Sequence, residues 1–364
     1  MNSEQREVID EIVTKIRTGR MTRRTFLERA VTVGLSSTAA ISLLEACGGI
    51  STSAGGGGTA SGSGSPPPLA KKSHYKVGFS QNASNNPWRL AETASIKQEA
   101  ARRGDTLVFT DASNSASKQV SDVQSMIAQK LDVLLIAPIT EDALVPAVLA
   151  AKQASIRVIL IDRDVNHALA KPNQDYVTFI GSDFVLQGKR DADWLIQAMG
   201  GQAKIIELEG TTGSSPAIDR KKGFDDEIKA KAPGMQIIAS QDGDFNRDTG
   251  RRVMETLLQA HPDVTAVYAH NDEMALGAIS ALQAAGKKPG KDVILCSIDG
   301  ERDALNAIIA GELGTTVQSS PFFGPISFQT IDQYVSGQKL PNWIVVHDLQ
   351  FTKANAAQNL ANSF

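Results

Sequence analysis

From Tyr75 to Gln318 the chain alternates short apolar runs with longer amphipathic stretches, and this alternation constrains the fold more than any other feature of the sequence. Runs such as Val133–Ala137 have the length and β-branched content of strands, whereas stretches such as Trp88–Arg103 have the apolar spacing of helices. Strands that alternate with helices form parallel βαβ units. There are too many units for one compact sheet, so we predict an α/β fold of two doubly wound parallel-sheet lobes.

The predicted strands, in order, are Lys76–Ser80, Thr106–Asp111, Val133–Ala137, Val158–Asp162, Val177–Gly181, Ala203–Glu209, Gln236–Ser240, Ala266–His270, Val293–Ile298 and Thr315–Gln318. In open α/β sheets, ligands bind beyond the carboxyl ends of the strands. The residues that follow these strands are therefore the first candidates for a binding site.

The run Arg157–Asp164 illustrates such a strand end, because consecutive apolar residues stop abruptly at Asp162 and Arg163. A carboxylate accepts hydrogen bonds and a guanidinium donates them, so the pair suits a ligand with several hydroxyl groups. The alternative is a salt-bridged strand end with no ligand, and this stretch alone does not decide between the two.

Similar polar residues recur at other strand ends. They are Gln81, Asn85, Asn86, Trp88 and Arg89 after the first strand, Asp111 after the second, Thr211, Thr212 and Arg220 after the sixth, Phe245 after the seventh, Asn271 and Asp272 after the eighth, Asp299 after the ninth and Gln318 at the last. Amides, charged groups and aromatic faces together are typical of a polyol site. Asn271 alone is explained equally well as a helix N-cap, but capping does not explain the recurrence across many strands.

The first 47 residues have the pattern of an export signal. Thr22–Leu27 contains a twin arginine, and a mildly apolar run from Ala30 to Leu44 follows it. This run is shorter than the roughly 20 apolar residues that a membrane span needs. It ends at Leu44–Cys47, which resembles a bacterial lipoprotein box with Cys47 as the acylated residue, although Glu45 is atypical there. A plain signal anchor is the alternative.

Residues 48–73 are rich in Gly and Ser and include Pro66–Pro68, which predicts a flexible linker that cannot form a core. We also considered that Glu4–Leu35 forms the helices of a DNA-binding head, which would make the chain a sugar-responsive transcription regulator. No basic recognition helix stands out in that segment, and the linker is a poor hinge for such a head.

Charge and residue spacing argue against several other classes of protein. The net charge of -3 disfavours a nucleic-acid partner that is recognised through phosphate. The two cysteines, Cys47 and Cys296, match no metal spacing, and Cys296 lies in an apolar run as a buried thiol. The loop Asp242–Asn246 begins like a calcium loop, but Arg247 stands at its glycine position. We therefore expect no metal and no cofactor.

Residues 76–351 resemble the type I periplasmic sugar-binding proteins of ABC importers, in particular the ribose-binding group and, within it, the galactofuranose binders. The motifs that carry the likeness are Val77–Gln81, Trp88-Arg89, Leu160–Arg163, Glu207–Gly210, Ala217–Phe224, Gly243–Arg247, Tyr268–Ala278 and Ser297–Gly300. Where ribose binders have two Phe, this chain has Trp88-Arg89.

The resemblance implies the roles of particular residues. Sugar contacts carry over to Asn85, Asn86, Trp88, Arg89, Asp162, Arg163, Arg220, Phe245, Asn271 and Asp299, with Asp111 and Gln318 at the margin of the site. It also implies an N-terminal lobe of residues 74–182 plus 319–345, a C-terminal lobe of 183–318 plus 346–364, and a three-segment hinge on which the lobes close. The partners implied are a monosaccharide and ABC permease subunits with their ATPase. We expect an extracytoplasmic monomer that is anchored to the membrane by lipid on Cys47.

Two alternatives concern the chemistry at the site. Within the same family the ligand could be ribose, another pentose or another polyol instead of the favoured galactofuranose or galactose-like hexose. A glycosidase-like enzyme could use Asp162 and Asp299 as its carboxylate pair. We expect the neighbouring Arg163 and Arg220 to keep both carboxylates charged, which is the wrong state for a general acid. We therefore expect a binding protein and not an enzyme.

Overall fold

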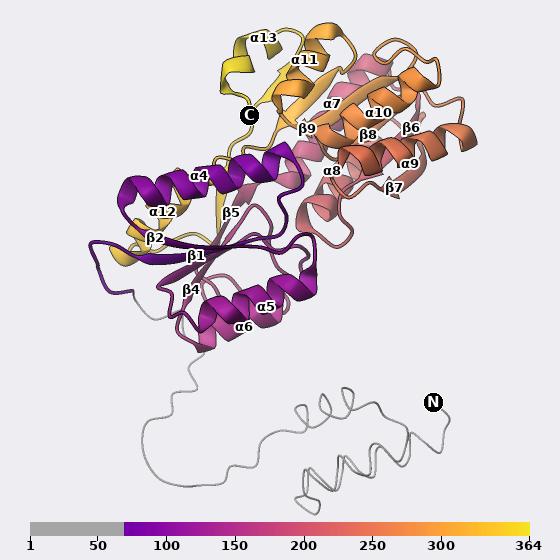
Figure 1. Cartoon of the computed structure of the whole chain (residues 1–364). Helices are drawn as coiled ribbons and strands as arrows, with labels where there is room; N and C mark the ends of the chain where they lie inside the picture. The colour runs from indigo at the N-terminus through magenta and orange to yellow at the C-terminus, as the bar shows by residue number, and fades with distance from the viewer. Residues whose placement is uncertain (1–68) are drawn as a thin grey trace, which may run out of the picture. The chain divides into compact units, whose positions relative to one another are not determined.

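The computed structural model describes residues 69–364. The predicted export segment, Cys47 and most of the predicted linker lie outside these residues. The described part of the chain forms two α/β lobes (Figure 1).

The sheet of the first lobe has six strands in the order β11-β5-β4-β3-β1-β2, all paired in parallel. The strands are β1 (Lys76–Gln81), β2 (Thr106–Asp111), β3 (Val133–Ile136), β4 (Arg157–Ile161), β5 (Thr178–Ser182) and β11 (Trp343–Val346). Helices α4 (Pro87–Arg103) and α12 (Phe323–Val335) cover one face, and α5 (Ala116–Ile127) and α6 (Val145–Gln153) cover the other (Figure 1).

The sheet of the second lobe repeats this plan, in the order β12-β10-β9-β8-β6-β7. Its strands are β6 (Ala203–Glu209), β7 (Met235–Asp242), β8 (Ala266–Ala269), β9 (Ile294–Asp299), β10 (Thr315–Gln318) and β12 (Gln350–Thr352). Helices α7 (Phe184–Met199) and α8 (Ser215–Lys231) pack on one face. Helices α9 (Arg247–Ala260), α10 (Asp272–Ala284) and α11 (Arg302–Ala310) pack on the other. The short α13 (Ala356–Asn359) and the 3-10 helix Leu360–Asn362 lie against α11.

The chain passes between the two sheets three times, after β5, after β10 and between β11 and β12. In each sheet the strand order reverses beside the first strand, β1 or β6, which is the point where ligands bind in doubly wound folds. The predicted fold class, two doubly wound parallel-sheet lobes joined by three crossing segments, is confirmed.

Burial explains why the apolar runs form the central strands. Every residue of β3 and of β8 is buried, as a strand covered on both faces by helices requires. The helices begin and end where capping residues stand: Asn86 accepts a hydrogen bond from the backbone of Arg89, and α4 ends at Gly104 with φ 72°.

The elements after Gln318 were not delimited by the sequence pattern. Helix α12 follows β10 directly, and β11 and β12 are short strands, of which β12 pairs antiparallel with β10. Strand β11 is only partly buried, so it lacks the continuous apolar run that marks the central strands. Helix α6 begins at Val145, because the preceding residues form turns.

The last residues of the predicted linker belong to the first lobe instead. Leu69 is buried in the apolar cluster that contains Tyr75, and Lys72 forms an ion pair with Asp132 at 2.5 Å. The backbone of Lys72 also donates to the hydroxyl of Tyr75. Residues 69–73 are therefore not part of a flexible linker, because the buried Leu69 anchors them to the first lobe.

None of the helices within residues 69–364 is both long and apolar enough to cross a membrane.

Candidate functional site

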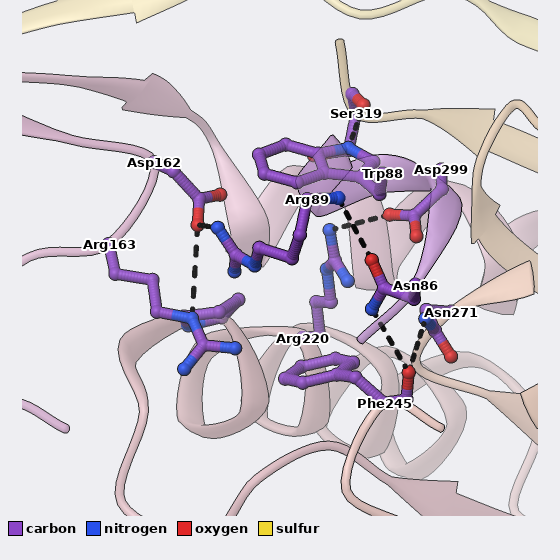
Figure 2. Close-up of a pocket in the computed structure, with 11 residues that line it drawn as sticks. Asn86, Trp88, Arg89, Asp162, Arg163, Arg220, Phe245, Asn271, Asp299 and Ser319 are labelled. Carbon is purple, nitrogen blue, oxygen red and sulfur yellow. Dashed lines mark hydrogen bonds and ion pairs between the residues drawn. The ribbon is translucent and has the colours of Figure 1, made fainter. Parts of the chain in front are cut away.

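A small cavity of about 30 Å³ lies between the carboxyl ends of the two sheets (Figure 2). Its lining comes from both lobes and is mainly charged, amide and aromatic: Asn86, Trp88, Arg89, Asp162, Arg163, Pro216, Arg220, Phe245, Asn271, Asp299 and Ser319. Side chains of the two lobes therefore converge on one space.

The start of α4 brings two of these side chains to the cavity. Trp88 is 4 % exposed, and its indole Nε1 donates to the carbonyl of Ser319 at 2.6 Å, which fixes the ring against the crossing segment after β10. The guanidinium of Arg89 lies 4.5 Å from the centre of the Trp88 ring, a cation–π distance. The aromatic ring and the guanidinium are thus held as one unit.

The turn after β4 supplies the partner of Arg89. Asp162 has φ 59°, a left-handed conformation that is uncommon for a residue other than glycine. Its carboxylate Oδ2 lies 2.6 Å from Nη1 of Arg89 and 3.8 Å from Nε of Arg163. Strain at a residue that faces a cavity is typical of functional sites, where the surrounding structure holds the backbone in place.

Arg163 is buried and extends toward the second lobe. Its Nη1 donates to the carbonyl of Ile139 at 2.8 Å, and its guanidinium lies 5.3 Å from the centre of the Phe245 ring. Burial, together with the charge of Arg89, lowers the pKa of Arg163 to about 9. The site thus gathers two guanidinium groups around one carboxylate, and Asp162 is needed to offset their repulsion.

The second lobe contributes Arg220 from the second turn of α8. Its Nε donates to Oε1 of Gln187 at 2.9 Å, and its Nη1 donates to the carbonyl of His270 at 2.6 Å. Its Nη2 lies 3.5 Å from the carboxylate of Asp299. Two neutral acceptors therefore fix this guanidinium, and its contact with the carboxylate is looser than the pairing of Arg89.

Asp299 ends β9 with φ 141°, and Gly300 follows with φ 80°. The carboxylate of Asp272 holds this turn by accepting from the backbone N–H of Gly300 at 2.7 Å and of Glu301 at 2.8 Å. Burial raises the pKa of Asp299 well above its ordinary value, although Arg220 opposes the shift. The expected effect of the arginines is therefore opposed at Asp299 by desolvation, which is the larger influence on its pKa.

Phe245 connects the two lobes. Its carbonyl accepts from Nδ2 of Asn86, at the start of α4, and from Nδ2 of Asn271, at the start of α10, both at 3.3 Å. Its ring lies within 5.8 Å of the Arg220 guanidinium on one side of the cavity (Figure 2). An aromatic face that is surrounded by fixed donors and acceptors is suited to a sugar ring, which has apolar C–H faces and polar edges.

The structure brings most of the predicted site residues to this cavity: Asn86, Trp88, Arg89, Asp162, Arg163, Arg220, Phe245, Asn271 and Asp299. Three others are not in its lining. Asn85 is exposed, Asp111 lies at the end of the edge strand β2, where it accepts from the backbone of Ser113, and Gln318 accepts from the backbone of Leu349. Gln318 thus joins two of the crossing segments.

The sequence analysis missed two lining residues, Pro216 and Ser319, and the polar groups behind the site. Ser319 acts through its backbone carbonyl, which no residue pattern reveals. Glu92 and Gln187 hold the two arginines, and the spacing of Glu92 three residues after Arg89 on a helix is the one signal that could have found it.

Within residues 69–364, no group of His, Cys, Asp and Glu side chains is arranged to hold a metal ion. In the loop that begins like a calcium site, Asp242 and Asp244 accept hydrogen bonds from Thr212 and Thr211. The described thiol, Cys296, is buried, and burial raises its pKa well above the ordinary value.

Comparison with known proteins defines the class. The family model described as "Periplasmic binding protein domain" matches residues 77–339, and the chain belongs to this family.

Three similar proteins carry the comparison further. The galactofuranose-binding protein YtfQ of Escherichia coli is 40% identical over 277 residues, which cover 75% of this chain and 86% of that protein. The ribose import binding protein RbsB of Bacillus subtilis is 36% identical, with 77% and 90% covered. A solved periplasmic component of the arabinose ABC transporter of Shewanella sp. ANA-3, bound to L-arabinofuranose, is 39% identical, covers 79% of this chain and 95% of its own, and has a TM-score of 0.75.

Proposed function

We propose that this chain is the extracytoplasmic sugar-binding component of an ABC importer and that it holds one monosaccharide in the cavity between its lobes. The observation that carries the proposal is the convergence of Arg89 and Asp162 from one lobe with Arg220 and Asp299 from the other. Each of these buried groups can exchange a protein partner for a sugar hydroxyl. Permease subunits then receive the sugar from the closed protein.

We propose a hexose in its furanose form, with galactofuranose as the leading candidate. Relatives whose names specify galactofuranose, ribose and arabinofuranose all support a five-membered ring or a compact sugar. Arg89 supports the longer sugar, because its guanidinium can donate to the second hydroxyl on the two-carbon arm of a hexofuranose, whereas ribofuranose has a one-carbon arm with a single hydroxyl. A site that pairs a hydroxyl discriminates strongly against ligands without it.

Calorimetry against galactose, ribose, arabinose, fructose, xylose and inositol tests this choice. We expect the tightest binding with galactose, whose furanose form is present in solution. The Arg89→Ala variant should lose more affinity for the hexose than for any pentose that binds. Tight ribose binding without a response to galactose would show that the ligand is a pentose and not a hexose. The sugar-binding role would remain supported. No heat with any sugar would contradict that role.

We further propose that the sugar leaves the site unchanged. The raised pKa of Asp299 removes one argument against a general acid, so the proposal rests on the relatives, whose names describe binding proteins. Incubation of the protein with p-nitrophenyl galactofuranoside should release no nitrophenol. Release that is lost in Asp299→Asn would point to a glycosidase.

The anchoring proposal rests on sequence alone, because Cys47 lies outside the described residues. We propose that Cys47 is acylated after export through the twin-arginine route and that residues 48–68 tether the folded body to the membrane. Cys47→Ser should move the protein from the membrane fraction to the soluble extracytoplasmic fraction. Cys296→Ala, at the other cysteine, is the matched control and should stay with the membrane. A membrane-bound Cys47→Ser variant would contradict lipid anchoring.

A further inference from the structure

Glu92 is a buried carboxylate directly behind the site, on α4 one turn after Arg89. It is 0% exposed, and its Oε2 accepts from Nη1 of Arg89 at 3.0 Å and from Nε2 of Gln81 at 2.8 Å. Its other oxygen, Oε1, has no hydrogen-bond partner among the described residues. A fully buried acid is rare unless it is paired, so the Arg89 contact accounts for its presence here.

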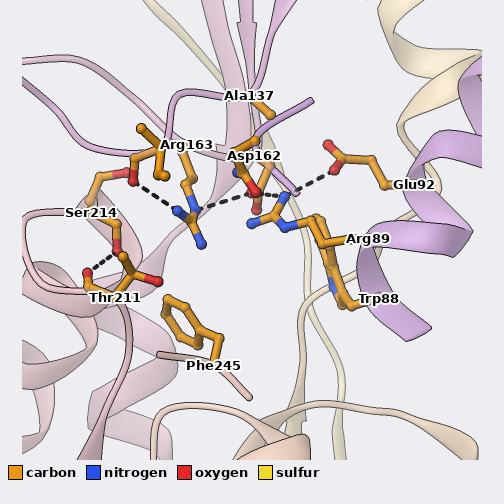
Figure 3. Close-up of polar contacts among 12 residues, drawn as sticks. Trp88, Arg89, Glu92, Ala137, Asp162, Arg163, Thr211, Ser214 and Phe245 are labelled. Atoms are coloured by element: carbon orange, nitrogen blue, oxygen red, sulfur yellow. Dashed lines mark hydrogen bonds and ion pairs between the residues drawn. The ribbon is translucent and has the colours of Figure 1, made fainter. Parts of the chain in front are cut away.

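The same nitrogen of Arg89 serves a second acid. Nη1 lies 2.6 Å from Oδ2 of Asp162, on the cavity side, and 3.0 Å from Oε2 of Glu92, on the helix side. Figure 3 shows the resulting row of alternating charges, Glu92, Arg89, Asp162 and Arg163. Two carboxylates therefore share one guanidinium nitrogen, which has two N–H donors. The position of Arg89 between them decides how much of the Asp162 carboxylate remains free for a ligand.

We propose that Glu92 is a positioning residue for sugar binding, whose ionised carboxylate draws Arg89 away from Asp162 and so makes the affinity for sugar depend on pH. This inference rests on the proposed sugar-binding function. With Glu92 ionised, Arg89 is shared and Asp162 keeps an oxygen for a sugar hydroxyl. With Glu92 neutral, Arg89 pairs fully with Asp162, because an arginine next to one remaining carboxylate forms a bidentate pair.

Glu92 gains or loses its charge at a pH close to neutrality. Burial raises the pKa of Glu92 to about 7, and Asp162 adds to this effect while Arg89 opposes it. Arg89 itself stays charged, as arginines in proteins do. Protonation below about pH 7 therefore acts on Glu92, and we expect sugar affinity to fall as the pH is lowered through this value.

The elements around Glu92 contain few other charged groups at this end of α4. Strand β1 contributes the neutral Gln81, and the turn after β4 contributes Asp162 and Arg163. The edge strand β2 ends in Asp111, and α12 carries Asp332 and Tyr334, of which Asp332 pairs with Arg103 at the far end of α4. Arg89 and Asp162 thus dominate the surroundings of Glu92.

The test is calorimetry of the wild-type protein with galactose from pH 6 to pH 8, compared with Glu92→Gln. If only the ionised form binds well, the dissociation constant should rise about tenfold between pH 8 and pH 6. Glu92→Gln keeps the size of the side chain and removes its charge, so its affinity should be no higher than that of the wild type at pH 6 and should not change with pH. A flat wild-type profile, or a pH-dependent Glu92→Gln variant, would overturn the proposal.

The same helix offers a matched control in Glu99, whose carboxylate accepts from Nε of Arg102 at 2.8 Å. This pair has the same three-residue spacing but lies far from the cavity. Glu99→Gln should keep the wild-type affinity and pH profile. If its profile flattens, loss of any acid from α4 accounts for the effect and the positioning role fails.

A measurement on the wild type alone covers the case in which Glu92→Gln does not fold. Binding at pH 7, measured in buffers of different ionisation enthalpy, should release about half a proton, because sugar selects the ionised form of a group that is half protonated. Binding with no proton release refutes the role of Glu92 and leaves the proposed function standing. Absence of binding to every sugar at pH 8 refutes the proposed function and this inference with it.

Discussion

The two halves of the site hold their arginines in different ways. In the first lobe, Arg89 is shared between two carboxylates, at 2.6 Å and 3.0 Å. In the second lobe, Arg220 is fixed by the amide oxygen of Gln187 and a backbone carbonyl, and the carboxylate of Asp299 lies farther away, at 3.5 Å. The first half thus holds its arginine mainly by two charged acids, whereas two neutral acceptors and one more distant carboxylate hold the arginine of the second half.

This difference separates two ways of preparing a site for a polar, uncharged ligand. A guanidinium that is held by neutral acceptors keeps its direction at any pH near neutrality, and its free N–H groups point at the ligand permanently. A guanidinium between two acids can shift from one to the other when one of them is protonated. We therefore expect the first half to regulate affinity and the second half to provide a constant framework.

The largest expected effect concerns how the free energy of unfolding changes with pH. Each half of the site contains a buried acid that contributes to this change. Burial raises the pKa of Glu92 to about 7 in the first half and of Asp272 to about 6 in the second. For an acid whose pKa is raised on folding, the stabilisation is fully present below the ordinary pKa and is lost as pH rises through the folded value. The Glu92 step is about 3 kcal/mol, since each unit of pKa shift is about 1.4 kcal/mol.

Urea unfolding at several pH values checks this prediction. The free energy of unfolding should fall between about pH 5 and pH 8, and Glu92→Gln should remove the upper part of the fall only. Glu207 does not interfere, because the His270 and Lys221 side chains hold its pKa at about 2 despite burial, and its contribution changes only in more acidic solution. Stability that rises over this range would contradict the account of both halves.

The second prediction compares the two site carboxylates. Asp162→Ala leaves Arg89 and Arg163 without their shared partner, and removal of a partner from a buried charge costs on the order of 2–5 kcal/mol. Sugar affinity should fall about a hundredfold. Asp299→Ala should cost less, because Gln187 and the carbonyl of His270 still hold Arg220. Calorimetry that ranks the two variants in the opposite order would reverse the comparison.

The third prediction concerns the turn that carries Asp299. Asp272→Ala deprives the backbone N–H of Glu301 of its acceptor and leaves that of Gly300 with Thr316 alone, so we expect a loss of about 2 kcal/mol in the free energy of unfolding. Asp303→Ala is the control, since the Asp303 side chain is 63% exposed in its pair with Arg247 and should contribute little. Equal losses in the two variants, measured by urea unfolding, would show that Asp272 has no special role.

The smallest expected effect tests two neighbouring amides. Asn86 caps α4 by accepting from the backbone of Arg89 at 2.9 Å, and it reaches Phe245 of the other lobe, whereas Asn85 is exposed. Asn86→Ala should weaken sugar binding about fivefold to tenfold, because Asn86 lines the cavity and loss of one hydrogen bond costs about 1 kcal/mol. Asn85→Ala should bind like the wild type. A larger loss of sugar affinity in Asn85→Ala than in Asn86→Ala would show that Asn85 contacts the sugar.

Much of the fold was predictable, because strands that are buried on both faces must be apolar throughout. Strands such as β3 and β9 therefore stand out in the sequence, and the helices between them have recognisable caps. Strand β12 was not predictable, since a three-residue antiparallel strand has too short a pattern to detect. The anchoring of Leu69 was missed for a similar reason, because one buried side chain does not change the composition of a linker.

The site was predictable where strand ends carry charge, as at Asp162 and Asp299, although their binding role stays a prediction. The conformations of these residues were not, since both have positive φ that glycine would adopt more easily. Gln318 stands at a strand end like the others, yet its side chain turns to Leu349 in a crossing segment. Glu92 was missed because it reaches the site only through Arg89, and its three-residue spacing from Arg89 does not show by itself that the pair is buried behind a site.

Small-angle X-ray scattering of the full chain, with and without saturating galactose, tests most directly whether the two halves act on one shared ligand. If one sugar engages Arg89 and Asp162 together with Arg220 and Asp299, binding holds the lobes together, and the radius of gyration should decrease in the wild type. Asp162→Ala, measured at the same sugar concentration, should show a smaller decrease or none. Equal radii with and without bound sugar in the wild type, at a concentration that calorimetry proves saturating, would contradict a ligand shared by the two lobes.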